Sequence, residues 1–165
     1  MDLVRGAAER WRALLPSLDV DPMLIVGRVQ RLWALWDAQL RPTFAEADLQ
    51  AGDFDVLAAL RRADAPTAPS ELARAMLVTA GATTKRVDRL VAAALAERVP
   101  GSTDGRQRLV RLTPAGVQFT DQLMAQHMRV EARLLAPLTA TERQQLEVLL
   151  TKLLTAADAP EPTPD

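Results

Sequence analysis

Apolar residues recur at helical spacing along almost the whole chain, and one short segment alternates as a β-strand does. That segment is Arg108–Leu112, and Val99 is its expected partner across the intervening turn. Helices are expected at residues 3–15, 23–40, about 54–60, 67–76, 79–98, 113–135 and from 139 to beyond 154. The pattern therefore predicts a mainly α fold with a small α+β element.

Capping residues and prolines mark where several of these helices are expected to begin and end. Pro42 is expected to stop the second helix, because proline is poorly tolerated inside one. Thr67 and Thr79 are expected N-caps. Thr139 and Glu142 have the spacing of a capping box at the start of the last helix.

The charge of the chain is unevenly distributed. Its 165 residues carry a net charge of −1. Residues 79–111 nevertheless hold seven Lys or Arg against three acids, a local balance of +4, whereas residues 1–60 hold six against nine. Local basic clustering is the pattern that nucleic-acid binding leaves in a sequence. A solvated, arginine-rich helix face is the alternative reading of the same charges.

The composition excludes several classes of function. The chain has no cysteine and one histidine, His127. Disulfides, thiolate metal sites and multi-histidine metal sites are therefore not expected, and no nucleophile–base set stands out. We expect no catalytic residues, no metal and no cofactor. No apolar run is long enough to span a membrane, and charged residues break any signal-peptide pattern, so a cytoplasmic protein is expected.

Three successive helices followed by a basic hairpin predict a winged helix-turn-helix, whose recognition helix enters the DNA major groove. The first turns of the expected recognition helix, residues 79–86, hold small, hydroxyl and basic side chains. These are suited to base and phosphate contacts. The hairpin tip carries Asp104, Arg106 and Arg108, which would reach the minor groove or phosphates.

The helices flanking this domain are expected to form a homodimer, because their apolar faces exceed what one winged helix can cover. The residues concerned are Trp33, Leu123, Val130, Leu134, Leu146, Leu150 and Leu153. The expected organisation is therefore N-terminal helices over 1–44, a winged helix over 45–112, C-terminal dimerisation helices over 113–157 and a disordered tail over 158–165.

Four segments resemble the MarR (multiple antibiotic resistance regulator) family over roughly residues 23–155. These are residues 79–90, 95–98, 104–106 and 110–116, the last containing Leu-Thr-Pro-Ala-Gly. The resemblance implies a dimeric bacterial DNA-binding regulator, often a repressor released from double-stranded DNA by a small aromatic ligand. It assigns DNA contacts and wing support to Thr83, Thr84, Lys85, Arg86, Arg106, Asp88 and Asp104. Gly105 departs from the pattern, because many members carry a second arginine there.

The front half of the chain is similar to the urate-responsive branch of that family, which has an extra N-terminal helix. The resemblance implies that Trp11, Asp55 and Arg86 surround an anionic purine, with residues 1–44 supplying a wall of the ligand site. An indole can stack on a flat ring, and an arginine can pair with its negative charge.

Each of these three residues also has a simpler interpretation. Trp11 could pin the terminal helix to the core, Asp55 could pair with Arg61 or Arg62, and Arg86 could contact only phosphate or solvent. The alternative function is a winged-helix module for protein interaction that does not bind DNA in a sequence-specific way.

Overall fold

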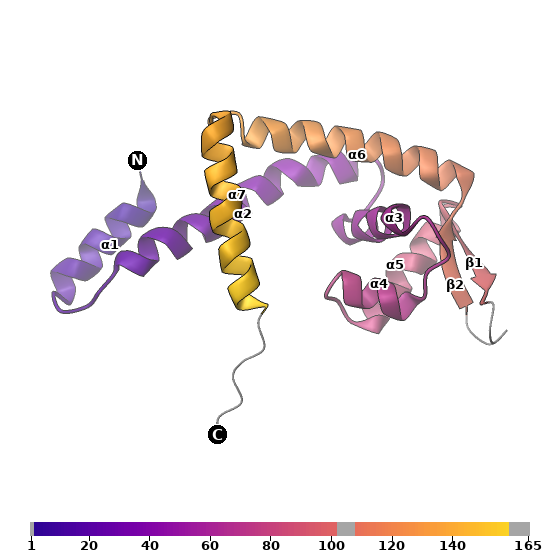
Figure 1. Cartoon of the computed structure of the whole chain (residues 1–165), viewed down its shortest axis with the longest axis horizontal. Coiled ribbons are helices and arrows are strands. Elements are labelled where there is room, and N and C mark those ends of the chain that lie inside the picture. Colours follow the sequence, from indigo (N-terminus) through magenta and orange to yellow (C-terminus); the bar gives the residue numbers. More distant parts are fainter. Residues whose placement is uncertain (1, 102–107, 159–165) are drawn as a thin grey trace, which may run out of the picture. The chain divides into compact units, whose positions relative to one another are not determined.

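The computed structural model describes residues 2–101 and 108–158, with seven helices and two strands in that part of the chain (Figure 1). The elements are α1 (Leu3–Leu14), α2 (Asp21–Ala45), α3 (Ala51–Ala63), α4 (Pro69–Ala75), α5 (Ala80–Ala92), β1 (Ala96–Pro100), β2 (Arg108–Leu112), α6 (Pro114–Leu134) and α7 (Ala140–Ala157). The chain divides into two compact units, Met1–His127 and Met128–Asp165. The prediction of a mainly helical winged-helix fold is confirmed.

The core of the winged helix lies where α3, α4, α5 and the hairpin meet. Its fully buried side chains are Val56, Leu57, Val87, Leu90 and Val110. Leu60 and Leu72 are almost fully buried. β1 and β2 pair antiparallel, and Val99 lies opposite Leu109 as predicted. Thr67 adds an isolated bridge to Val110, with backbone hydrogen bonds of 2.8 and 2.9 Å in the two directions.

The recognition helix α5 ends earlier than its sequence predicted. The expectation of a helix to Arg98 is wrong, because α5 ends at Ala92 and Ala94 adopts a left-handed conformation with φ of 57°. Arg98 lies instead in β1, opposite Val110. The pairing of β1 with β2 supplies backbone hydrogen bonds that a longer helix would have to replace.

Two other helix boundaries also differ from expectation. Pro42 lies inside α2, which continues to Ala45. The missing proline N–H leaves the carbonyl of Ala38 without its helical donor, but Ala38 is exposed and water can replace that bond. Thr67 is not the N-cap of α4. Ala68 occupies that position, and its N–H donates to the Glu71 carboxylate at 3.2 Å.

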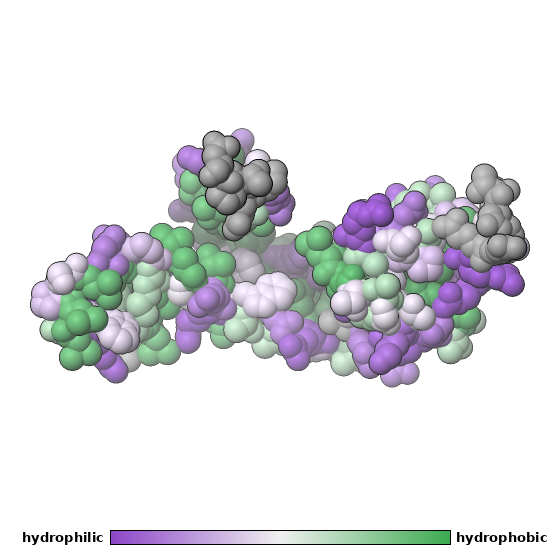
Figure 2. Space-filling view, turned by 90° about the horizontal axis from the view of Figure 1, so that it is seen from below, coloured by the Kyte–Doolittle hydropathy of each residue, from purple (hydrophilic) through white to green (hydrophobic). Residues whose placement is uncertain are grey.

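At the N-terminal end, α1 packs along α2 and two ion pairs join them. Arg28 pairs with Asp2 at 2.5 Å, and Arg12 pairs with Asp21. Many apolar side chains of these helices remain exposed, and Figure 2 shows hydrophobic residues, in green, on this part of the surface. Trp33 is 66% exposed.

The start of α6 packs on α2 and α3. Leu123 is buried against Phe44 and Phe54, so the expectation that it faces a second subunit is wrong. His127 lies beside the same two rings, with centroid separations of 5.7 and 4.9 Å. Val130 is also buried.

In the second unit, α7 begins at the predicted capping box of Thr139 and Glu142. No residue of α7 is buried. No helix in the described part of the chain combines the length and the hydropathy needed to cross a membrane.

Candidate nucleic-acid interface and ligand site

The recognition helix α5 has an outward face and a core face. Gly81, Thr84, Lys85 and Asp88 are exposed at helical spacing and form the outward face. Thr83, in contrast, is fully buried, and its hydroxyl donates to the carbonyl of Thr79 at 3.1 Å. The prediction that Thr83 contacts DNA is therefore wrong in this structure, because its side chain belongs to the core with Val87 and Leu90.

The first turn of α5 carries little side-chain bulk. Thr79 caps the helix by accepting from the Ala82 N–H at 3.3 Å, as predicted. Thr84 donates to the Ala80 carbonyl at 3.0 Å. A Cβ added at Gly81 would meet no other atom within 4 Å, so this turn is open to a close neighbour. Helix N-termini also carry partial positive charge, which favours phosphate.

Most arginines of the winged helix are paired with the chain's own acids. Arg61, Arg86, Arg89, Arg98 and Arg111 form ion pairs. Arg62, Arg74, Lys85 and Arg108 are exposed and have no ion pair to a described residue. Arg62 and Arg74 were not among the predicted DNA contacts, because the sequence does not show which cations pair with the chain's own acids.

Arg86 points toward α3 and is partly covered, with 22% of its side chain exposed. Its Nη1 lies 3.9 Å from the Asp55 carboxylate, which is an ion pair but too long for a hydrogen bond. That nitrogen is buried without a hydrogen-bond partner. The guanidinium of Arg86 lies in the space that a side chain at residue 52 would fill. A Cβ built on Gly52 would lie 2.3 Å from the Cζ atom of Arg86.

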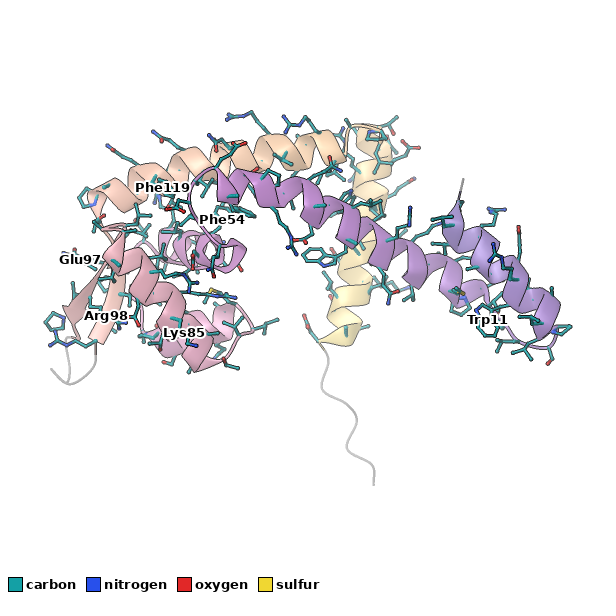
Figure 3. All side chains as sticks on the ribbon, turned by 180° about the vertical axis from the view of Figure 1, so that it is seen from behind. Trp11, Phe54, Lys85, Glu97, Arg98 and Phe119 are labelled. Atoms are coloured by element: carbon teal, nitrogen blue, oxygen red, sulfur yellow. The ribbon has the colours of Figure 1, made fainter. Side chains whose placement is uncertain are left out.

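The structure therefore brings together two of the three predicted ligand residues, Asp55 and Arg86. The alternative that Asp55 pairs with Arg61 is wrong, because Arg61 pairs with Asp121 at 2.8 Å and with Asp64 at 3.5 Å. Trp11, on α1, is 47% exposed. Figure 3 shows Trp11 far from Lys85, the neighbour of Arg86 on α5.

A second and tighter connection joins α5 to the first turn of α3. Asp53 is almost fully buried and accepts from Arg89 Nε at 3.1 Å and from Arg89 Nη2 at 2.5 Å. It also accepts from the backbone N–H of Gln50 at 3.2 Å. The hydrogen bond to Asp53 raises the pKa of Arg89. This pair was missed, because its partners lie 36 residues apart in sequence.

In the hairpin, Asp88 of α5 pairs with Arg98 of β1 at 2.6 Å, and Arg111 of β2 pairs with Glu97 at 2.7 Å. Figure 3 shows Glu97 and Arg98 together on this strand. Asp88 thus joins the recognition helix to the hairpin. The predicted wing residues Asp104, Gly105 and Arg106 lie outside the described residues. Arg108 is the first residue of β2.

The comparisons with known proteins agree with this arrangement. A profile described as MarR family matches residues 47–107. The HTH-type transcriptional regulator PecS of Dickeya dadantii is 34% identical over 152 residues, which cover 91% of this chain and 92% of PecS. The multiple antibiotic resistance protein MarR of Escherichia coli K12 is 38% identical over 121 residues, covering 72% and 82%. A structure of mutant E. coli MarR complexed with operator DNA gives a TM-score of 0.70 at 32% identity, covering 84% of this chain and 99% of that one.

The fold and the outward face of α5 define a winged-helix protein of the DNA-binding class. The chain belongs to the MarR family of DNA-binding transcriptional regulators. Its relatives are regulators and not enzymes, which confirms the expectation that the chain is not an enzyme. Its likeness to the urate-responsive branch stays a prediction.

Proposed function

We propose that this chain is a dimeric, ligand-responsive repressor that acts in the cytoplasm on a pseudo-palindromic operator. The outward face of α5 carries this proposal, because Thr84 and Lys85 project there beside a first turn without bulky side chains. Arg62, Arg74 and Arg108 would add phosphate contacts. Arg106 keeps its proposed contact from the wing.

Dimer formation is supported by apolar side chains that the chain leaves exposed. They lie on α2 and α7 and include Ile25, Val26, Val29, Leu32, Trp33, Val148, Leu149, Leu153 and Leu154. Extensive exposed apolar surface in a water-soluble protein marks an interface with a partner. In the proposed dimer the two α5 helices would enter successive major grooves about one helical turn apart.

Ligand response is supported by the surroundings of Arg86. A buried guanidinium nitrogen without a hydrogen bond, beside the exposed carboxylate of Asp55, can donate to an oxygen of a flat anion such as urate or a phenolic acid. A ligand bound there would compete with Asp55 for Arg86 and so change how α5 is held against α3. By linkage it would lower operator affinity by about 1–3 kcal/mol.

Trp11 keeps its proposed place at the ligand, although its helix α1 packs along α2 in the single chain. Its contact with a ligand on Arg86 therefore requires a second subunit or a movement of α1. The substitution Trp11→Phe is expected to weaken the ligand response and leave operator binding without ligand nearly intact. An unchanged response would remove Trp11 from the site.

The test is binding to the DNA upstream of the protein's own gene, measured by fluorescence anisotropy against a scrambled duplex. Urate, xanthine and salicylate are added at millimolar concentrations. We expect tight, sequence-dependent binding that falls steeply with salt and is weakened by at least one of these anions. Sequence-independent or absent binding would favour the protein-interaction module. Operator binding that none of the anions changes would contradict the ligand site.

A further inference from the structure

The segment that links the hairpin to α6 also fastens α6 to the exit of the recognition helix. The Thr113 N–H donates to the Leu95 carbonyl at 3.1 Å. Its hydroxyl donates to the Ala94 carbonyl at 2.8 Å and accepts from the Gly116 N–H at 3.0 Å. One side chain therefore caps α6 and bonds the backbone that follows α5.

Gly116 allows the first turn of α6 to lie against the backbone of Leu95. A Cβ built on Gly116 would lie 1.9 Å from the Leu95 carbonyl oxygen and 2.8 Å from its carbon. Both are backbone atoms, which cannot swing aside as a flexible side chain can. A residue other than glycine would push the first turn of α6 away from the end of α5.

The surrounding bonds hold both sides of this contact. On the α5 side, the Leu95 N–H donates to the Leu90 carbonyl at 2.9 Å, and Ala96 pairs with Leu112 in the hairpin. On the α6 side, the fully buried hydroxyl of Thr120 donates to the Gly116 carbonyl at 2.7 Å. The last turn of α5, the base of the hairpin and the first turns of α6 are thus joined as one block.

We propose that Thr113 and Gly116 are positioning residues that set the spacing of the two recognition helices on the operator. The inference rests on the proposed dimeric DNA-binding function. α6 continues along the chain into α7, which carries part of the apolar surface proposed for the dimer. The angle between α5 and α6 would therefore decide where each α5 meets the DNA. Neither residue touches DNA in this proposal. They act through the angle between α5 and α6.

The main variant is Gly116→Ala, and its matched control is Gly6→Ala, since Gly6 is also helical but has no neighbour within 4 Å. Thr113→Val removes the hydroxyl, and Thr113→Ser retains it. Each protein is checked for a cooperative thermal transition. It is then titrated with the operator and with operators whose half-sites are one base pair closer or farther apart.

We expect Gly116→Ala and Thr113→Val to bind the operator of natural spacing about tenfold more weakly, a loss similar to that caused by one mismatched base pair. On an operator of altered spacing, their loss of affinity should be smaller. Thr113→Ser and Gly6→Ala should behave as the wild type. A general loss of stability would lower binding to every spacing equally. Equal losses, or no loss, would overturn the proposal.

Hydrogen exchange of the free protein separates this inference from the function on which it rests. Gly116→Ala should speed exchange at the amides of Leu95 and Thr113, and Gly6→Ala should not. Wild-type protein that binds no DNA would contradict the proposed function and the spacing role together. Unchanged exchange in Gly116→Ala would overturn the junction itself, whatever the DNA result.

Discussion

The carboxylate of Asp53, almost fully buried at the start of α3, holds the guanidinium of Arg89 on the recognition helix at 2.5 Å. One helical turn earlier on α5, Arg86 meets Asp55 at 3.9 Å, and the Asp55 side chain is mostly exposed. The recognition helix is therefore fixed to α3 by one tight pair and one loose pair. The tight pair belongs to the fold, and the loose pair is the one that a ligand would displace in the proposed function.

Asp53→Ala should lower the free energy of unfolding by about 2–3 kcal/mol, because it leaves Arg89 and the Gln50 N–H without their partner. Urea unfolding followed by circular dichroism measures the change. Asp55→Ala is the matched control and should cost less than about 1 kcal/mol, since its pair is long and exposed. Equal losses in the two variants would show that the pairs do not differ as described.

Lys85→Ala should weaken binding to all DNA sequences alike and lower the slope of log affinity against log salt by about 1, if its ammonium contacts a phosphate. Anisotropy titrations at several salt concentrations give both values. Arg10→Ala, on α1, also removes one exposed positive charge but outside the outward face of α5, and it should change neither. A slope that stays at the wild-type value would exclude Lys85 from the phosphate contacts.

Gly52→Ala should weaken urate binding to the free protein by about tenfold or more. The new methyl group would displace the Arg86 guanidinium from its position, and the ligand would lose a charged hydrogen bond. Isothermal titration calorimetry without DNA measures this directly. Gly6→Ala adds the same methyl group in open space and should bind urate as the wild type does. Wild-type affinity in Gly52→Ala would place the ligand elsewhere.

Trp33→Glu should convert the proposed dimer to monomer at micromolar concentration, because a charge would be buried in an apolar interface. Sedimentation velocity resolves the two species. Leu77→Glu is the comparison, since Leu77 is 91% exposed but lies in the turn between α4 and α5. A dimer that survives Trp33→Glu would remove this part of α2 from the interface.

Stability should fall in acid partly through Asp121. Hydrogen bonds from Arg61 lower the pKa of this carboxyl below its ordinary value of 3.8. A lowered folded-state pKa means that the pair stabilises the protein above the unfolded-state pKa and ceases to do so as the pH falls through the folded-state value. The Tm of Asp121→Asn should therefore lie below the wild-type Tm at pH 7 and converge with it in strong acid. A constant difference in Tm across the pH range would contradict this.

The parts of the fold predicted from sequence are those with local signals. Thr79, the capping box at Thr139 and the alternation of Arg108–Leu112 each act within a few residues, and each was placed correctly. The C-terminal end of α5 depends instead on the pairing of β1 with β2, a strand more than ten residues farther along the chain. Pro42 stays helical because Ala38, whose carbonyl loses its helical donor, is exposed to water, which the sequence does not reveal.

The candidate site divides in the same way. The burial of Thr83 could have been foreseen, because it lies four residues before Val87 and seven before Leu90 on the core stripe. The pairs of Arg86 and Arg89 with acids of α3 could not, since they join segments more than thirty residues apart. The resemblance named Asp55 and Arg86 together, and their proximity agrees with it.

The pairing of Arg86, Arg89, Arg98 and Arg111 with the chain's own acids bears on how such a protein would search a genome. Attraction to DNA of arbitrary sequence depends on cations that are free to meet phosphates. With these four engaged, attraction to unrelated sequences would depend on the exposed cations of the winged helix that have no ion pair to a described residue, Arg62, Arg74, Lys85 and Arg108. A protein of this kind would draw its residence time on the rest of the chromosome from this small set of side chains.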